Sequence, residues 1–163
     1  MTQRLTASIA LIGILAMTGP AAPARALERG EVVIAHRDRA YSVDVEIACT
    51  APERAFGLME RDALADNAGM LFLYSRAQPA DHGFWMYRTR LPLDIAFLDA
   101  DGTIHAIRTM TPCPPDPAGN CPSYKPDRPY RAALEVNAGY FARHAIRVGD
   151  CVTLPGLIAG CRR

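Results

Sequence analysis

The sequence has no excess of charge of either sign: 18 lysines and arginines stand against 17 aspartates and glutamates in 163 residues. It also lacks a basic stripe interleaved with aromatic residues, so we expect no nucleic-acid partner. No run of about 20 apolar residues occurs, which argues against a membrane-spanning helix. A glycine-rich phosphate loop, a G-x-S-x-G elbow and a Cys-x-x-Cys pair are missing too. The sequence therefore contains no complete catalytic or metal-binding signature.

The first 26 residues differ in character from the rest. Arg4 precedes an apolar run at Ala7–Met17, and Ala24-Arg25-Ala26 has the small-x-small form of a cleavage site. This order of features is typical of a secretory signal peptide. We therefore expect residues 1–26 to be removed and residues 27–163 to form one β-rich domain, periplasmic or secreted, without stable membrane insertion.

All five cysteines lie in the part expected to be exported, where an oxidising compartment permits disulfides. Cys113 and Cys121 flank a proline-rich loop, and closing that loop is the natural use of the pair. Pairing of Cys151 with Cys161 competes with pairings that use Cys49. The odd count leaves one thiol over, and the apolar face on which Cys49 lies favours a buried, inert thiol there.

Alternation of polar and apolar residues predicts a mainly antiparallel sheet. Tyr41–Cys49 alternates over its whole length, as expected of a strand with one buried and one solvated face, and Glu31–His36 is its predicted partner. Leu93–Asp99 and Thr103–Met110 flank a turn sequence and predict a second hairpin. Further strands are predicted at Gly69–Tyr74, Gly83–Tyr87, Tyr130–Val136 and Ile146–Leu154.

Only two short helices are predicted. Thr50 and Glu53 have the spacing of a capping box, and the helix after them is expected to run to about Arg61. The second helix is expected from Asn137 to about His144. Because the strands are not separated by long helices, a doubly wound parallel sheet is disfavoured. The predicted fold class is α+β, mainly β: a small, mostly antiparallel barrel or rolled sheet of about seven strands with two short helices.

A series of short motifs resembles one protein family. Arg54, Gly57-Leu58-Met59 and Arg61 follow an R-x-x-G-L-M-x-R pattern. The further matches, in order, are Gly69-Met70-Leu71-Phe72, Phe84-Trp85-Met86, Thr89, Pro92-Leu93-Asp94-Ile95, Phe97, Asp99, Asp101-Gly102, Glu135-Val136-Asn137-Ala138-Gly139 and Gly149-Asp150. Together they resemble the bacterial and archaeal family called domain of unknown function 192.

This resemblance covers about Tyr41 to Leu154. It implies a compact β-rich domain that is often exported, and it implies no activity. The sequence departs from the family at Tyr87 and Arg88, where Lys-Asn is usual. If an amide at that position contacts a ligand, Arg88 changes the charge that the ligand prefers.

Arg54, Asp94 and Glu135 are charged residues within apolar segments. A buried carboxylate has to be paired or protonated. We expect Arg54 to pair with Asp94 and to fix the helix on the sheet. A polar cluster at the mouth of a ligand pocket is the second interpretation, and acid–base catalysis by all three residues is the third.

Trp85, the only tryptophan, is followed by Met86. Trp85 is either a core aromatic or, with Tyr74 and Tyr87, a platform on which a sugar or planar group stacks. The candidate ligand-binding residues are Arg54, Trp85, Met86, Arg88, Asp94, Glu135 and Asn137, and no catalytic or metal-binding residue is assigned.

Methionines and histidines raise the possibility of copper, because thioethers and imidazoles are soft ligands. Met59, Met70, Met86 and Met110 with His82 and His105 form no Met-x-x-Met or His-x-x-Met motif, so core packing is the preferred account of the methionines. The sequence thus predicts an exported module without a cofactor that binds a small polar ligand or a protein. An enzyme using Arg54, Asp94 and Glu135 and a periplasmic copper protein are the alternatives.

Overall fold

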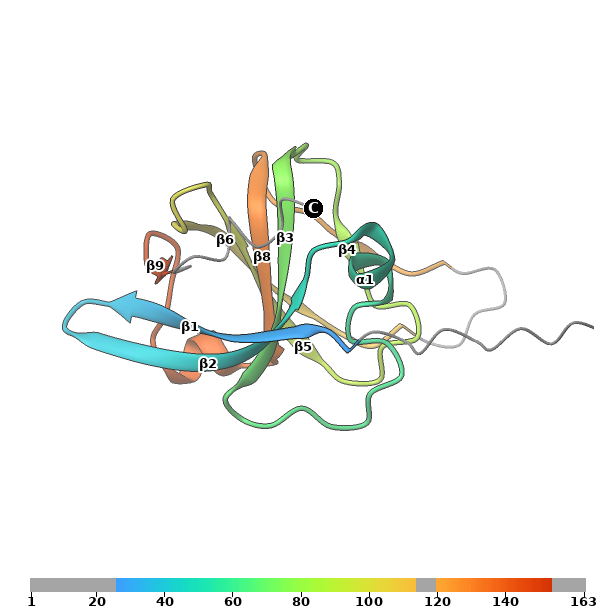
Figure 1. The fold of residues 1–163 in the computed structure, drawn as a ribbon, viewed down its shortest axis with the longest axis horizontal. Coiled ribbons are helices and arrows are strands. Elements are labelled where there is room, and N and C mark those ends of the chain that lie inside the picture. The colour runs from blue at the N-terminus through green and yellow to red at the C-terminus, as the bar shows by residue number, and fades with distance from the viewer. Residues whose placement is uncertain (1–25, 114–119, 154–163) are drawn as a thin grey trace, which may run out of the picture.

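The computed structural model describes residues 26–113 and 120–153. Its main sheet has seven strands in the order β6-β5-β8-β3-β2-β1-β9, and β4 and β7 form a separate two-stranded ribbon (Figure 1). Neighbouring strands are antiparallel except β2 and β3, which are parallel. The elements are β1 (Glu28–His36), β2 (Arg39–Ala48), α1 (Ala51–Phe56), β3 (Ala68–Gln78), β4 (Phe84–Trp85), β5 (Leu93–Leu98), β6 (Ile104–Met110), β7 (Ser123–Tyr124), β8 (Tyr130–Asn137), α2 (Tyr140–Arg143) and β9 (Cys151–Thr153).

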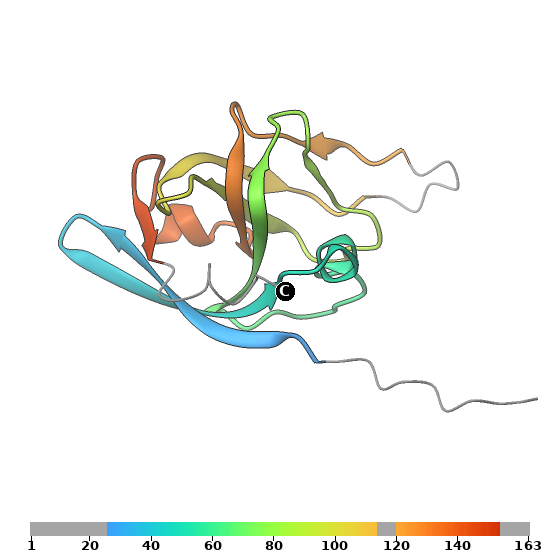
Figure 2. The ribbon, with the colours of Figure 1, turned by 45° about the horizontal axis from the view of Figure 1, so that its top comes forward.

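The main sheet curls into a half-barrel, as Figure 2 shows. Its two ends contribute to one hydrophobic cluster: Ile34 of β1 and Val152 of β9 pack with Leu98 of β5 and Ile104 of β6. The ends also meet through the backbone, because Ile104 N–H donates to the carbonyl of Asp150 at 2.8 Å and Gly149 N–H donates to that of Ile104 at 2.8 Å. The predicted fold class, a rolled and mostly antiparallel sheet with two short helices, is confirmed.

The predicted alternation along β2 is confirmed by burial. Val43, Val45 and Ile47 are buried in the concave core, and Val43 lies opposite Val32 of β1. The hairpin begins before its predicted limit, at Glu28, and ends one residue before it, at Ala48. Arg39, predicted to lie in the turn, belongs to β2 because it pairs with His36.

The start of α1 agrees with its predicted capping box. The hydroxyl of Thr50 accepts from Glu53 N–H, and the carboxylate of Glu53 accepts from Thr50 N–H at 2.8 Å. The predicted end near Arg61 is wrong. Gly57 has φ +52°, a left-handed conformation that stops the helix at Phe56, and a Cβ there would lie 3.3 Å from the ring of Phe72.

The start of α2 also differs from the prediction. Asn137 is the last residue of β8 and lies opposite Leu93 of β5, so sheet pairing holds it in an extended conformation. Gly139, with φ +78°, precedes the first helical residue instead. Among the described residues, no helix has the length and apolar character needed to cross a membrane.

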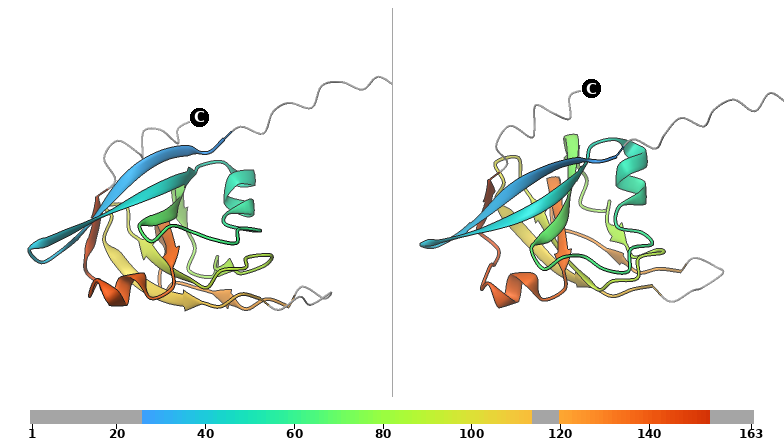
Figure 3. Two further views of the ribbon diagram at one scale, coloured as in Figure 1. Left: turned by 90° about the horizontal axis from the view of Figure 1, so that it is seen from below. Right: turned by 60° about the horizontal axis from the view of Figure 1, so that its bottom comes forward.

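A second hydrophobic cluster covers the convex face of the sheet. Met70 and Phe72 of β3 pack there with Leu58, which follows α1, and Met86, which follows β4. Figure 3 shows α1 at one end of the half-barrel and α2 at the other. The methionines Met70, Met86 and Met110 all belong to this convex cluster, as core packing requires.

The cysteine predictions are partly wrong. Cys113 and Cys121 form the expected disulfide, with their Cα atoms 5.5 Å apart. Cys49, however, is disulfide-bonded and is not an inert thiol, and Cys151 carries a free thiol, so it is not paired with Cys161. Cys161 itself and the segment predicted to be a signal peptide, up to residue 25, lie outside the described residues.

Candidate functional site

A cavity of about 560 Å³ opens beside the ribbon formed by β4 and β7. We call it the aromatic pocket. Two of the three stacking candidates, Trp85 and Tyr74, line it, and Tyr130 at the start of β8 is its third ring. The other lining residues are Gln78, Asp81, His82, Gly83, Cys121 and Ser123.

Local backbone geometry creates this pocket. β3 and β8 are regularly paired up to Leu73, after which the register shifts and the next pair is Gln78 with Tyr130. The chain then turns through residues 79–83 into β4, where Trp85 lies opposite Ser123. Gly83 is needed at this approach, because a Cβ there would lie 2.4 Å from the hydroxyl oxygen of Ser123.

Trp85 and Tyr87 form an exposed aromatic platform. Their ring centroids are 5.3 Å apart with an interplanar angle of 27°, and their exposed fractions are 52% and 39%. Large aromatic side chains gain most from burial, so a stacked pair left in solvent at the edge of a cavity is suited to covering by a ligand.

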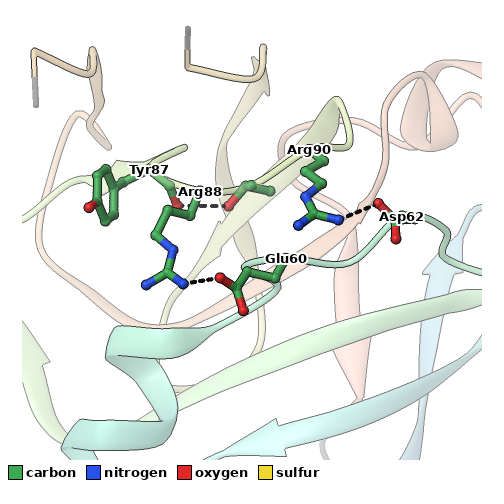
Figure 4. Close-up of polar contacts among 6 residues, drawn as sticks. Glu60, Asp62, Tyr87, Arg88 and Arg90 are labelled. Carbon is green, nitrogen blue, oxygen red and sulfur yellow. Dashed lines mark hydrogen bonds and ion pairs between the residues drawn. The ribbon is translucent and has the colours of Figure 1, made fainter. Parts of the chain in front are cut away.

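The turn after the platform is fastened to the segment that follows α1 (Figure 4). Glu60 N–H donates to the carbonyl of Arg88 at 2.8 Å, and the guanidinium of Arg88 donates to the carboxylate of Glu60. Arg90 donates to Asp62 at 2.6 Å in a second ion pair of the same kind. Arg88 is therefore neutralised by Glu60, and it does not line the aromatic pocket.

Glu60 and Arg88 both have a left-handed backbone, with φ values of +63° and +54°. Non-glycine residues rarely adopt this conformation, because it is unfavourable. It persists only where contacts with the surrounding structure hold the residue in place. Here the doubled contact between the two residues supplies that constraint. The contact holds the two loops together and fixes the direction from which Tyr87 leaves the chain.

The tyrosines of the pocket stay protonated. Burial raises the pKa of Tyr74, and burial also raises the pKa of Tyr130. The hydroxyl of Tyr130 donates to the carbonyl of His82 at 3.0 Å and so holds the loop before β4. Apart from these two phenols, Asp81 and His82 are the ionisable residues of the lining, so the pocket contains no cluster of like charges.

Arg54 lies beneath the pocket and acts on backbone groups. Its guanidinium donates to the carbonyl of Cys49 and, at 3.0 Å, to that of Leu73. The same group lies 4.6 Å from the ring centroid of Tyr74, in cation–π contact. Arg54 thus joins the end of β2 to β3 and supports a pocket ring, and the predicted pair with Asp94 is wrong.

Asp94 and Glu135 do not join Arg54 in a cluster. Asp94 is 3% exposed on the concave face and accepts from the hydroxyl of Thr109 at 2.7 Å. Glu135 is 5% exposed, and it lies on the convex face of β8 together with Ala133. Burial raises the pKa of Glu135 to about 8, and none of the ion pairs among the described residues includes it.

Asn137 and Met86 make contacts that hold the fold together. The amide of Asn137 donates to the carbonyls of Leu64 and Ala65 at 3.1 and 3.0 Å and holds the loop before β3. Met86 is buried in the convex cluster. In residues 26–113 and 120–153, no three His, Cys, Asp or Glu side chains gather in a way that could hold a metal ion.

The sequence singled out Trp85, Tyr74 and Tyr87 but not the rest of the pocket lining. Gln78, Asp81, His82, Ser123 and Tyr130 come from three separated segments that only the fold brings together. The one available signal was Gly83, directly before the Phe84-Trp85 motif, because a glycine there indicates a close backbone approach.

Two relatives are described among the solved structures that are similar to this chain. One, from Sinorhizobium meliloti 1021, is described as a "putative transcription regulator"; it is 30% identical, with a TM-score of 0.74 over 82% of this chain and 99% of that one. The other is a protein of unknown function from Novosphingobium aromaticivorans DSM 12444; it is 31% identical, with a TM-score of 0.71 over 85% of this chain and 94% of that one. No curated protein matches.

The sequence resemblance is confirmed by a family model. The model for DUF192, described as "Uncharacterized ACR", matches residues 32–154, which include every strand from β2 to β9 and most of β1. The motifs noted in the sequence lie within this range, and one of their residues, Trp85, lines the aromatic pocket. The chain therefore belongs to the DUF192 family.

Proposed function

We propose that this DUF192 protein binds a small, uncharged, hydroxyl-rich ligand of the saccharide type in the aromatic pocket. The observation that carries the proposal is the exposed, stacked pair of Trp85 and Tyr87 at the edge of a cavity that mixes aromatic and polar side chains. A volume of about 560 Å³ falls within the usual range of small-molecule sites, roughly 300–1,000 Å³.

The lining suits the two sides of a sugar ring. The C–H face of a pyranose stacks on an aromatic ring such as that of Trp85. The hydroxyl groups then find acceptors and donors in Gln78, Asp81 and Ser123. Phenols that stay neutral donate and accept hydrogen bonds without imposing a charge preference, which favours an uncharged ligand over an ion.

Other functions have less support. Acid–base catalysis by Arg54, Asp94 and Glu135 is disfavoured because the two carboxylates lie on opposite faces of the sheet. The balanced charge of the chain does not favour a nucleic-acid partner, whatever role the Sinorhizobium relative has. Copper is disfavoured because three of the four candidate methionines are packed in the convex core.

Because Trp85 is the only tryptophan, its fluorescence reports directly on the pocket. We expect a saturable change on titration with N-acetylglucosamine, maltose or a cell-wall disaccharide. Calorimetry with Trp85→Ala is expected to show binding weakened at least tenfold. Phe56→Ala is the matched control, because Phe56 is 51% exposed and lies outside the lining. Absence of saturable binding to any of these saccharides would contradict the proposal.

We also propose that the protein is exported to the periplasm or secreted. The signal-peptide pattern in residues 1–26 supports this, and the Cys113–Cys121 disulfide suits an oxidising compartment. Intact mass of protein made in an export-competent host should give a chain beginning at Leu27. A dominant species that keeps Met1–Ala26 would contradict export with cleavage.

A further inference from the structure

A second cavity, of about 380 Å³, lies at the tip of the β1–β2 hairpin, near α2 and far from the aromatic pocket. Figure 3 shows this hairpin and α2 at the end of the half-barrel opposite α1. We call this cavity the hairpin pocket. Its lining residues are His36, Arg37, Asp38, Arg39, Tyr41, His144 and Ala145.

Strand register explains why polar residues line the hairpin pocket. The concave face of β1 and β2 carries Val32 and Ile34 opposite Val43 and Tyr41, and the next cross-strand pair is His36 with Arg39. Side chains opposite one another lie on the same face of a sheet. The face that is apolar inside the core therefore becomes cationic where the hairpin leaves the core.

His36 has the features of a built site. It is only 6% exposed, and its Nδ1 lies 2.8 Å from the carboxylate of Asp150. The same carboxylate oxygen accepts from Arg147 N–H at 2.7 Å, so Asp150 is itself fixed. A carboxylate that occupies one imidazole nitrogen orients the ring and leaves the other nitrogen for a ligand.

The opposite wall is equally ordered. The ring of His144 packs against Tyr41 and Tyr140, with centroid distances of 4.5 and 4.6 Å. Arg37 and Arg39 line the pocket, and no ion pair or hydrogen bond within the described part of the chain engages either guanidinium. Arg61 and Arg88, by contrast, are both paired with glutamates. The lining thus contains two arginines, two histidines and one acid, Asp38, while the carboxylate of Asp150 is engaged by His36 and by the backbone N–H of Arg147.

We propose that the hairpin pocket binds a small oxyanion, a phosphate or carboxylate group, between the guanidinium groups of Arg37 and Arg39 and the imidazole of His36. Guanidinium groups match the geometry of such oxyanions and bind them with charge-assisted hydrogen bonds. The pocket has room for the group together with a small organic body. This proposal does not depend on the saccharide site.

The test is a titration of the full chain with inorganic phosphate, and separately with acetate and succinate, at constant ionic strength. Amide chemical shifts in ¹⁵N spectra measure binding. We expect saturable shifts at residues 36–39 and 144, with millimolar affinity. A stronger response to phosphate identifies a phosphate ligand, and a stronger response to succinate identifies a carboxylate ligand. Either order supports the oxyanion site, whereas linear shifts without saturation overturn it.

Variants separate a built site from general electrostatic attraction. Arg39→Gln and Arg37→Gln are each expected to weaken binding at least fivefold. Arg29→Gln removes the same charge from the same hairpin, outside the pocket and at a side chain that is almost fully exposed, and is expected to change the affinity less than twofold. Equal losses in all three variants would overturn the proposal. Arg37 is an exposed turn residue, so this variant remains informative if Arg39→Gln does not fold.

Discussion

Asp94 and Glu135 are diagonal neighbours across the β5–β8 pair, yet their carboxylates lie on opposite faces of the sheet. Asp94 is opposite Val136, and Glu135 is opposite Ile95. Asp94 shares the concave face with Ala96, whereas Glu135 shares the convex face with Ala133. The two carboxylates therefore have separate roles in the fold, and each has its own testable consequence.

Glu135 makes the stability of the protein fall as pH rises. Burial raises its pKa from 4.5 to about 8 in the folded chain, so the folded state keeps its proton over a range in which the unfolded state loses it. The full stability is present below about pH 4.5 and is lost progressively up to about pH 8. Glu135→Gln mimics the protonated acid and is expected to be more stable than the wild type at pH 8, by on the order of 4 kcal/mol.

Urea melts at pH 5 and pH 8 measure this difference. At pH 5 the free energies of unfolding of the wild type and Glu135→Gln should lie close together. Glu31→Gln is a matched control, because Glu31 is an exposed residue of β1 and its substitution should leave the pH profile unchanged. Parallel profiles for the wild type and Glu135→Gln would show that Glu135 is ionised in the folded protein.

Asp94 is expected to be coupled to Thr109 and not to Arg54. The hydroxyl of Thr109 lies 2.7 Å from Asp94, while Arg54 donates to backbone carbonyls. A double-mutant cycle of Asp94→Asn with Thr109→Val should give a coupling free energy of about 0.5–3 kcal/mol. The cycle of Asp94→Asn with Arg54→Met should be additive within about 0.5 kcal/mol. Coupling in the second cycle instead of the first would restore the Arg54–Asp94 pair.

The sequence predicted β2 well because that strand carries its own alternation, whereas β5 is buried on both faces and the strand predicted at Ile146–Leu154 begins only at Cys151. Tyr41–Cys49 has one polar and one apolar face whatever its partners are, and burial follows that pattern. The limits of the helices were harder to predict, because they depend on tertiary competition. Asn137 has the side chain of a helix cap, but pairing with Leu93 keeps it in β8.

The sites depended on relationships that the sequence does not contain. The face on which Glu135 lies relative to Asp94 follows from the register of β8 against β5, not from either strand alone. Arg54 was assigned a carboxylate partner because buried charges need one, but carbonyl oxygens of Cys49 and Leu73 meet that need. No motif marks a backbone acceptor, so this choice appears only in the folded chain.

His105 is expected to make the protein less stable in mild acid. It is the extra residue where β6 shifts register against β5, and its ring nitrogens are buried without a hydrogen-bond partner among the described residues. Burial lowers its pKa below 6.5, against a smaller opposing effect of Asp99. The stabilising contribution of the neutral ring is therefore present above about pH 6.5 and is lost as pH falls through the folded-state pKa.

His105→Leu should remove this loss. Thermal melts at pH 7.5 and 5.5 are expected to show a smaller decrease in Tm for the variant than for the wild type. The variant should also be at least as stable at pH 7.5, because replacing unsatisfied buried polar atoms removes their desolvation cost of about 1–3 kcal/mol. His82→Gln, at an exposed histidine, is the control and should follow the wild type. An unchanged acid response in His105→Leu would exclude His105 as its source.

The Cys113–Cys121 disulfide is expected to stabilise the fold and to shape the aromatic pocket. Closing this loop removes conformational freedom from the unfolded chain and is worth roughly 2–3 kcal/mol. Cys121 lines the pocket and leads into Ser123, which pairs with Trp85, so loss of the bridge should loosen one wall.

The double variant Cys113→Ser/Cys121→Ser should lose stability in urea melts and bind saccharide more weakly, as measured by Trp85 fluorescence. Cys151→Ser, at a free thiol outside the pocket, should change neither quantity. If the double variant loses stability but binds saccharide as the wild type does, the bridge supports the fold without forming the pocket wall; an unchanged stability would contradict its structural role altogether.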